Sequence, residues 1–170
     1  TAAQWDWVLG NASSMPNNFA ALPRAGVSWH QCAAFCNRLS EIMGLPDGEQ
    51  CYEALPNNYY RAKADPQLRR GFRMPSLAEW SYAARAMTST DRYWGRADGH
   101  LPKYANCRPR SSLSPIAGGL LKPNGLGLFD TLGNVTEWLH DGAGLAETQS
   151  GASALRHIRG GSAWTIASGV

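Results

Sequence analysis

The second half of this chain has no long periodic segment, and this feature limits its possible folds more than any other. After residue 90, short apolar pieces alternate with Gly, Pro, Asn and Ser over the remaining eighty residues, a pattern typical of short strands joined by turns. So much irregular chain is uncommon in a compact domain unless something holds the loops in place. The sequence offers seven Trp side chains for that purpose, and bound ions are a second means.

Length and composition are those of a globular domain. With 170 residues, of which 44% are hydrophobic and 17% charged, the chain is long enough to bury most of the surface that it exposes when unfolded. This excludes a mainly disordered chain. We expect a single domain over residues 1–170, trimmed at both ends, because the sequence opens in a helix start and stops just after a strand-like run.

Capping patterns predict two helices in the first half of the chain. Ser28 is followed by Gln31, and Ser76 by Glu79. At this spacing a cap hydroxyl and the side chain three residues later bond each other's backbone amides. The positions expected to face the core are Cys32, Phe35, Cys36, Leu39, Ile42 and Met43 in the first helix and Leu77, Trp80, Ala84 and Met87 in the second.

The other elements are expected to be short. A helix is predicted over residues 2–9, with Trp5 and Val8 directed inward. Strands or extended pieces are predicted at Gly127–Phe129, Val135–Leu139, Arg156–Gly160 and Ser162–Ile166. Together these elements predict a loop-rich α+β fold with two main helices and a small, mostly antiparallel sheet.

Basic residues are concentrated in the middle of the chain. Residues 59–110 carry eleven Lys and Arg against four Asp and Glu, whereas the whole chain has a net charge of +3. They form no helical stripe and match no nucleic-acid-binding fold, so we expect solvated or ion-paired arginines and no nucleic-acid partner. No run reaches the roughly 18 apolar residues of a membrane helix, which predicts no membrane span. The sequence leaves the compartment open, with an extracytoplasmic location favoured.

The four cysteines have two interpretations. They are either four buried thiols, or one pair, Cys36 and Cys51, forms a disulfide across the loop after the first capped helix. Cys32 and Cys36 lie four residues apart on that helix, so they are expected to pack inward rather than bond each other. No cysteine or histidine pair has the spacing of a structural zinc site.

A series of motifs points to a known family. The longest is GFRMPSLAEWSYAAR at residues 71–85. Six more lie around it, at Gly26–Trp29, Tyr93–Gly95, Tyr104–Asn106, Pro123–Asp130, Gly133–Trp138 and Arg159–Ser162. In this order they resemble the formylglycine-generating enzyme, or sulfatase-modifying factor, family, and short motifs do not match in register by chance. The resemblance implies a variant of the C-type lectin fold, in a bacterial branch often attached to other domains such as protein kinases.

The resemblance also implies which residues the chemistry of the family needs. The converting enzyme oxidises a cysteine of an unfolded sulfatase segment to formylglycine, using copper(I) held between two cysteines after the Gly-Gly-Ser run. Here Thr165 and Val170 stand at those two positions. Copper(I) prefers soft thiolate ligands, whereas a hydroxyl is hard and Val has no donor atom. We therefore expect no bound copper and no catalytic residue in this chain.

A calcium site is implied for loop 130–137. In the family the ion is held by side chains at the positions of Asp130 and Glu137 and by carbonyls at those of Gly133 and Val135, and all four positions match here. Carboxylate and carbonyl oxygens are the ligands that calcium takes. Bound calcium would also hold the long loops in place. The alternative is that Asp130 caps a turn and Glu137 pairs with an arginine.

Two further candidates are weaker. A second family calcium site begins at the positions of Asn106 and Cys107, but residues 108–114 replace its acidic loop, so we expect Asn106 to stabilise a turn instead. His140 beside Asp141 is the one histidine pair that suggests acid-base catalysis. Neighbours on a strand face opposite ways, so we expect a surface pair rather than a catalytic one.

The segment after Ser162 is the candidate ligand face. In the family it lies beside the substrate groove, and in variable proteins diversified by retroelements the same fold carries its binding surface there. Ser162, Trp164 and Thr165 are the candidate residues, with Trp164 either an exposed anchor or a core side chain.

These observations predict a non-catalytic, calcium-stabilised recognition or scaffold module that binds through the face near residues 162–170. The expected partner is a protein or peptide ligand, or an attached domain of a larger protein. The alternative is a sulfatase-modifying oxidase with an altered metal site, or one whose sulfur ligands lie beyond Val170.

Overall fold

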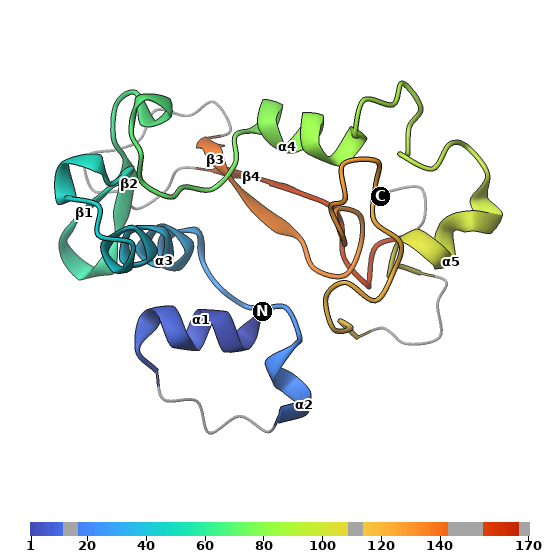
Figure 1. The fold of residues 1–170 in the computed structure, drawn as a ribbon, viewed down its shortest axis with the longest axis horizontal. Helices are drawn as coiled ribbons and strands as arrows, with labels where there is room; N and C mark the ends of the chain where they lie inside the picture. Colours follow the sequence, from blue (N-terminus) through green and yellow to red (C-terminus); the bar gives the residue numbers. More distant parts are fainter. Residues whose placement is uncertain (12–16, 109–113, 143–154, 167–170) are drawn as a thin grey trace.

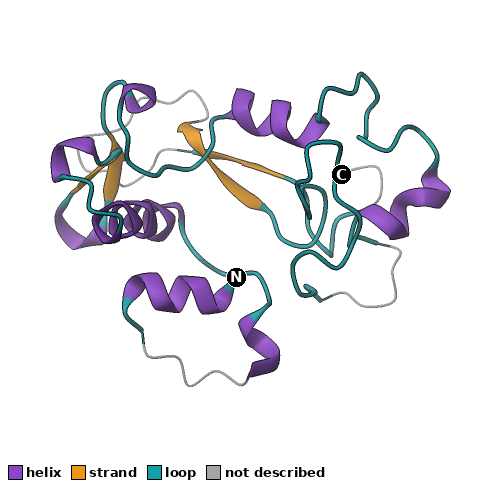
Figure 2. Cartoon of the chain, viewed as in Figure 1, coloured by secondary structure: helices purple, strands orange, loops and turns teal. Residues whose placement is uncertain are grey.

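The computed structural model describes residues 1–11, 17–108, 114–142 and 155–166 (Figure 1). Its helices are α1 (Ala2–Leu9), α2 (Asn17–Ala20), α3 (Trp29–Ile42), α4 (Leu77–Arg85) and α5 (Leu101–Tyr104), and its strands are β1 (Tyr52–Ala54), β2 (Tyr60–Ala62), β3 (Glu137–Gly142) and β4 (Arg156–Arg159). Single 3-10 turns lie at Asp47–Glu49, Pro56–Asn58, Pro66–Leu68 and Asp98–His100. Long loops join these elements (Figure 2), which is the loop-rich α+β fold expected from the sequence.

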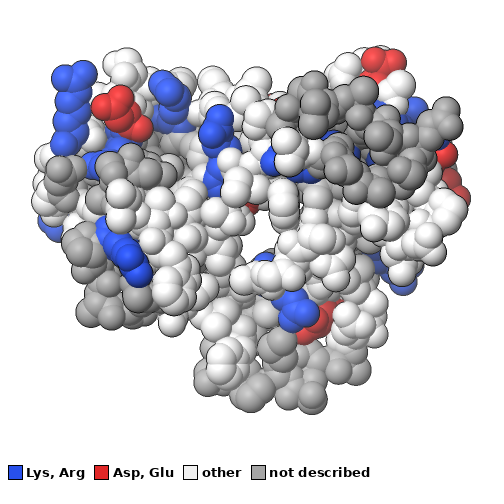
Figure 3. Space-filling model, turned by 180° about the vertical axis from the view of Figure 1, so that it is seen from behind, with Lys and Arg blue, Asp and Glu red and all other residues white. Residues whose placement is uncertain are grey.

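Strands β3 and β4 occupy the middle of the molecule. Figure 1 shows α3 with β1 and β2 at one end and the turn-rich loops with α5 at the other, with β3 and β4 between them. The two strands are antiparallel, and the first residue of β3 faces the last residue of β4. The loop that enters β3 and the segment that leaves β4 therefore meet at one end of this pair. The space-filling view also shows an opening between the N-terminal helices and the rest of the molecule (Figure 3).

Capping boxes start the three longer helices. The Ser28 hydroxyl accepts a hydrogen bond from the Gln31 amide at 3.2 Å, and the Gln31 side chain accepts one from the Ser28 amide at 2.8 Å. Ser76 and Glu79 do the same for α4. Both predicted capping boxes are confirmed because this bonding depends only on local spacing. Helix α1 has the bounds predicted for it and is capped by Thr1 in the same way.

The buried face of α3 differs from the predicted one. Its buried residues are Trp29, Ala33, Cys36, Asn37 and Ser40, whereas Met43 is 62% exposed. The hydrophobic pattern missed Asn37 and Ser40 because they are polar side chains that are buried while donating hydrogen bonds to the carbonyls of Tyr52 and Cys36. The Asn37 Oδ1 atom is buried without a partner among the described residues. In α4, Ala84 is buried as predicted, but the helix ends at Arg85, and Met87 beyond it is 75% exposed.

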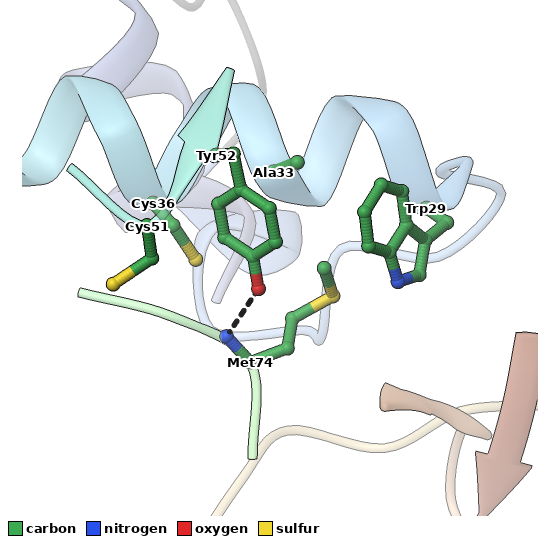
Figure 4. Packing of buried hydrophobic residues seen from close by; sticks show 6 residues of the cluster. All are labelled: Trp29, Ala33, Cys36, Cys51, Tyr52 and Met74. Carbon is green, nitrogen blue, oxygen red and sulfur yellow. Dashed lines mark hydrogen bonds between the residues drawn. The ribbon is translucent and has the colours of Figure 1, made fainter. Parts of the chain in front are cut away.

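The main core joins α3 to β1 and to the segment before α4 (Figure 4). It is made of Trp29, Ala33, Cys36, Cys51, Tyr52 and Met74. The Tyr52 hydroxyl accepts a hydrogen bond from the Met74 amide at 3.0 Å, and the Trp29 indole donates one to the Leu139 carbonyl at 2.8 Å. Buried aromatic side chains with satisfied polar atoms thus link segments that are far apart in sequence.

All four cysteines are thiols in the structure. Cys36 and Cys51 lie in the main core, and burial raises the pKa of Cys36 to about 12. The Cys36 thiol is therefore protonated at neutral pH and behaves as a small apolar side chain.

The strand predictions are confirmed in part. Strand β4 covers most of the predicted strand at residues 156–160, and β3 begins at Glu137, two residues later than predicted. The antiparallel pair β1–β2 was not predicted. Two predicted strands are wrong, since residues 127–129 and 162–166 form turns and loops. At the first of these, the Asn124 side chain accepts hydrogen bonds from the amides of Leu126 and Leu128, which fixes a turn.

The expectation that His140 and Asp141 form a surface pair is also wrong. His140 is buried, and its Nδ1 lies 3.0 Å from the Tyr52 hydroxyl. Asp141, on the opposite side of the strand, accepts a hydrogen bond from the amide of Leu77. Both residues thus tie β3 to neighbouring elements, and they do not contact each other as a catalytic dyad would.

Among the described residues, no helix is long and apolar enough to cross a membrane.

Candidate metal and ligand site

Asp130 lies in a turn, and one of its carboxylate oxygens is buried without a hydrogen-bond donor among the described residues. Its backbone has a φ of 56°, a conformation that Asp tolerates better than most residues. One carboxylate oxygen, Oδ2, accepts a hydrogen bond from the Gly119 amide at 2.7 Å. The other, Oδ1, is buried and has no hydrogen-bond partner. A buried carboxylate oxygen without a donor is unfavourable unless another group, such as a cation, satisfies it.

Glu137, at the start of β3, places a second carboxylate nearby. Its Oε2 accepts a hydrogen bond from the Trp80 indole at 2.5 Å. Burial raises the pKa of Glu137 above its usual value, and the negative charge of Asp130 raises it further. The ion pairs among the described residues join Arg38 to Glu41, Arg61 to Glu53 and Arg73 to Glu79, so neither carboxylate of this loop has a basic partner there.

Gly133 holds the loop against its neighbours. Its φ is 83°, and a Cβ at this position would lie 2.6 Å from the carbonyl oxygen of Asn106. Its amide donates to the Gly160 carbonyl at 2.6 Å, and the next amide, that of Asn134, donates to the Asn106 carbonyl at 2.8 Å. The carbonyl of Val135 lies beside Gly160 as well. The backbone of loop 130–137 is thus fixed between two other segments, with Gly required at the closest approach.

These residues offer the kinds of oxygen ligand that calcium takes. Two carboxylates lie within electrostatic range of each other, one of their oxygens lacks a donor, and carbonyls lie on the same turning backbone. No group of three or more His, Cys, Asp or Glu residues is placed to hold a metal in the described part of the chain, so a site here would need backbone oxygens too. Calcium accepts such mixed oxygen ligands, and its charge would offset the repulsion between the carboxylates. Among the residues that the structure describes, no arginine forms the ion pair with Glu137 that the alternative interpretation requires.

The position of the second calcium site has a different arrangement. The Asn106 amide nitrogen donates to the Ser114 carbonyl at 3.1 Å and to the Asn134 side chain at 3.3 Å. Cys107 is buried in a small apolar cluster with Leu101 and Ala105. The Asn106 side chain therefore links Ser114 to Asn134.

The candidate ligand face lies next to loop 130–137. The Ala163 amide donates to the Asn134 carbonyl at 3.0 Å, and the Arg108 amide donates to the Thr165 carbonyl at 3.0 Å. Trp164 and Ile166 are 59% and 61% exposed, respectively. The structure thus places the Trp164 side chain at the surface rather than in the core, on a backbone that is held from both sides.

Thr165 does not fit a copper(I) site. Its hydroxyl oxygen accepts a hydrogen bond from the Ser162 amide at 2.8 Å and lies 3.3 Å from the Ser162 hydroxyl. The side chain is therefore used to close a turn, and its oxygen is a hard ligand. Val170, the residue at the second copper position, lies outside the described residues.

Sequence reasoning missed two residues of this region. The Asn134 side chain accepts a hydrogen bond from the Ile116 amide at 2.9 Å and donates one to the Ile116 carbonyl at 3.1 Å. Trp80 contributes the indole that binds Glu137. The dipeptide Gly133-Asn134 is the one local pattern that indicates a turn here, because both residues tolerate a positive φ. No local pattern indicates the Trp80 contact, because it joins residues 57 positions apart.

A cleft of about 700 Å³ opens beside Glu137. Its lining includes Trp80, Leu128, Phe129 and Thr131, together with Arg73 and Glu79. The Arg73 guanidinium holds the pKa of Glu79 at about 2, so this pair remains charged at any physiological pH. Loop 130–137 therefore borders a concave, partly apolar surface that the sequence did not indicate.

Comparisons with known proteins agree with the motifs. The family model described as "Sulfatase-modifying factor enzyme 1-like domain" matches residues 2–168. A curated relative, the formylglycine-generating enzyme of Streptomyces coelicolor, is 35% identical over 114 residues, which cover 54% of this chain and 36% of that protein. The chain thus spans about a third of the length of this relative.

Solved structures show the same fold. The chain resembles Treponema denticola variable protein 1, with a TM-score of 0.78 and 26% identity over 99% of this chain and 72% of that one. It also resembles the crystal structure of CarF, with a TM-score of 0.71 and 22% identity over 96% of this chain and 70% of that one. Because the family model spans nearly the whole sequence and the fold agrees, the chain belongs to the sulfatase-modifying factor family, to which the formylglycine-generating enzymes belong.

Proposed function

We propose that this chain is a non-catalytic recognition domain, stabilised by one calcium ion, that binds a protein or peptide through residues 162–166, here called the ligand face. One observation carries the proposal. At a position where the oxidase needs a soft sulfur ligand, the Thr165 hydroxyl instead closes a turn with Ser162, while the neighbouring Trp164 and Ile166 side chains are exposed. The segment is suited to present apolar side chains, not to hold copper(I).

The chemistry of the ligand face favours a protein or peptide partner. An exposed Trp next to an exposed Ile offers a large apolar area, and Trp is enriched among the residues that dominate protein interfaces. The backbone beneath is held by hydrogen bonds to Asn134 and Arg108. A pre-formed face loses less conformational entropy when it binds. On the face of the molecule seen in Figure 3, Lys and Arg lie in separate groups, an arrangement that does not favour a nucleic acid.

Calcium has a structural role in this proposal. Loop 130–137 bonds the segment after β4 through Gly133 and Asn134. An ion held by Asp130 and Glu137, with the carbonyls of Gly133 and Val135, would therefore stiffen the support of the ligand face. It would also stabilise the folded chain over the unfolded one by its binding free energy.

The oxidase alternative is supported by the likeness to the Streptomyces enzyme. It requires an altered metal site or sulfur ligands beyond Val170, because the described ligand face contains no sulfur: its residues are Ser162, Ala163, Trp164, Thr165 and Ile166. Conversion of a sulfatase peptide by the full chain with copper(I) would establish this alternative and overturn the proposal.

Truncating Trp164 should remove most of the binding energy of the ligand face. Peptides are selected from a displayed random library on the full chain, and their affinities are then measured by calorimetry. Trp164→Ala is expected to weaken the selected peptides about 30-fold or more, because truncating a central interface Trp costs roughly 2 kcal/mol or more.

Tyr82→Ala is the control, since the Tyr82 side chain is aromatic and similarly exposed but lies on α4, outside the ligand face. The selected peptides should bind this variant as tightly as the unaltered chain. Peptides that bind Trp164→Ala unchanged, or that lose affinity with Tyr82→Ala instead, would contradict a ligand face at residues 162–166.

A further inference from the structure

A groove beside α1 and α3 has no role in the function proposed above. Its volume is about 570 Å³, within the usual range of small-molecule sites. Its lining is mostly apolar and consists of Thr1, Gln4, Trp5, Trp7, Val8, Pro23, Arg24, Phe35 and Leu39. It shares no residue with loop 130–137 or with the ligand face, so its role is independent of theirs.

The walls of the groove are aromatic and well packed. The Trp5 indole stacks on the Phe35 ring, with centroids 4.9 Å apart and planes 9° from parallel. This contact joins α1 to α3 and keeps Trp5 in place. Trp7, in contrast, is 68% exposed. A large exposed indole beside an apolar groove is typical of a surface that something else covers.

Arg24 gives the groove its charge. It is the one charged side chain among the lining residues. Its Nε is buried and has no hydrogen-bond partner, and none of the ion pairs among the described residues includes it. A buried N–H group of a guanidinium strongly favours an acceptor, and a carboxylate suits it best because it accepts two parallel hydrogen bonds.

We propose that this groove binds a small apolar carboxylic acid, with the carboxylate on Arg24 and the apolar part between Trp5, Trp7 and Leu39. Because Arg24 Nε lacks a hydrogen-bond acceptor in the described part of the chain, an anionic group on the ligand would be favourable. The aromatic lining favours an apolar group on the same molecule. The volume of about 570 Å³ suits a small molecule.

The test is calorimetry on the full chain with 4-phenylbutyrate and its neutral counterpart, 4-phenylbutyramide. The acid should bind saturably at one site per chain and at least about tenfold more tightly than the amide, because only the acid forms a charge-assisted hydrogen bond. NMR should show the indole N–H signals of Trp5 and Trp7 shifting with the same titration curve.

Arg24→Gln should bind acid and amide equally, at the affinity of the amide for the unaltered chain. Arg38→Gln is the matched control because Arg38 is an exposed arginine of α3 outside the groove, and it should keep the preference for the acid. Should Arg24→Gln not fold, Trp7→Ala replaces it and should weaken both compounds. Absence of saturable binding, equal affinities of acid and amide for the unaltered chain, or tighter binding of an apolar peptide amide would each overturn the proposal.

Discussion

Replacing Gly133 by alanine is expected to lower the free energy of unfolding by about 3 to 4 kcal/mol. At a φ of 83°, the added Cβ would lie 2.6 Å from the Asn106 carbonyl oxygen and 2.9 Å from its carbon, atoms of the backbone that cannot move aside alone. Strain from the left-handed conformation and the clash therefore act together. Thermal unfolding of the variant should be lower by roughly 10 °C for a chain of this size.

Gly127→Ala separates the two contributions. Gly127 has nearly the same φ, 78°, but a Cβ there would meet nothing within 4 Å. This variant should show only the conformational strain, about 1 to 2 kcal/mol. If Gly133→Ala is as stable as Gly127→Ala, the backbones of Asn106 and Gly133 are further apart than in the structure. Loop 130–137 would then not support the ligand face in the way proposed.

Removal of calcium is expected to have the second large effect. With free calcium at about 100 times its dissociation constant, the ion would contribute roughly 2.7 kcal/mol, which corresponds to a melting temperature about 5 to 10 °C higher than with a chelator. Calorimetric melting with and without chelator measures this difference. Its physical source is the pair of carboxylates, since Asp130 has a buried oxygen without a donor and the charge of Asp130 acts on Glu137.

Glu137→Gln tests whether the effect comes from this loop. The amide removes the charge but keeps the size of the side chain, so the chelator should no longer change the melting temperature. Glu41→Gln is the control, because Glu41 is an exposed carboxylate of α3 paired with Arg38, and its variant should respond to chelator like the unaltered chain. A chelator effect that persists in Glu137→Gln would place the ion elsewhere.

Local signals predicted the helices well. Ser28 and Ser76 specify their helix starts through atoms only three residues away, so no distant contact can easily override them. The hydrophobic pattern did less well for the buried face of α3, because Asn37 and Ser40 are buried by bonds to backbone carbonyls. A pattern of apolar residues cannot indicate polar side chains that are buried through hydrogen bonds to the backbone.

The short strands were harder to predict. Strands β1 and β2 have three residues each, and the Asn57 and Asn58 backbones between them both adopt a φ of 60°. Such short runs carry little alternation. At residues 162–166 the side chains of Ser162 and Thr165 hydrogen-bond locally and turn a strand-like run into a loop.

The sequence named the residues of the candidate site but did not predict their contacts. Family motifs indicated Asp130, Glu137 and the ligand face by position. They did not show that loop 130–137 and the segment after β4 share hydrogen bonds through Gly133 and Asn134. That contact depends on the pairing of β3 with β4, and the register of a non-local pair is not specified by either strand alone.

The central claim is that this chain keeps the calcium site of its family without the copper chemistry. Metal analysis tests it most directly: the purified full chain is loaded with excess calcium and copper(I), freed of unbound metal, and measured by inductively coupled plasma mass spectrometry. We predict close to one calcium per chain and no retained copper, because Asp130 and Glu137 offer hard oxygen ligands and Thr165 offers no sulfur. Stoichiometric copper, or no calcium, would contradict the account.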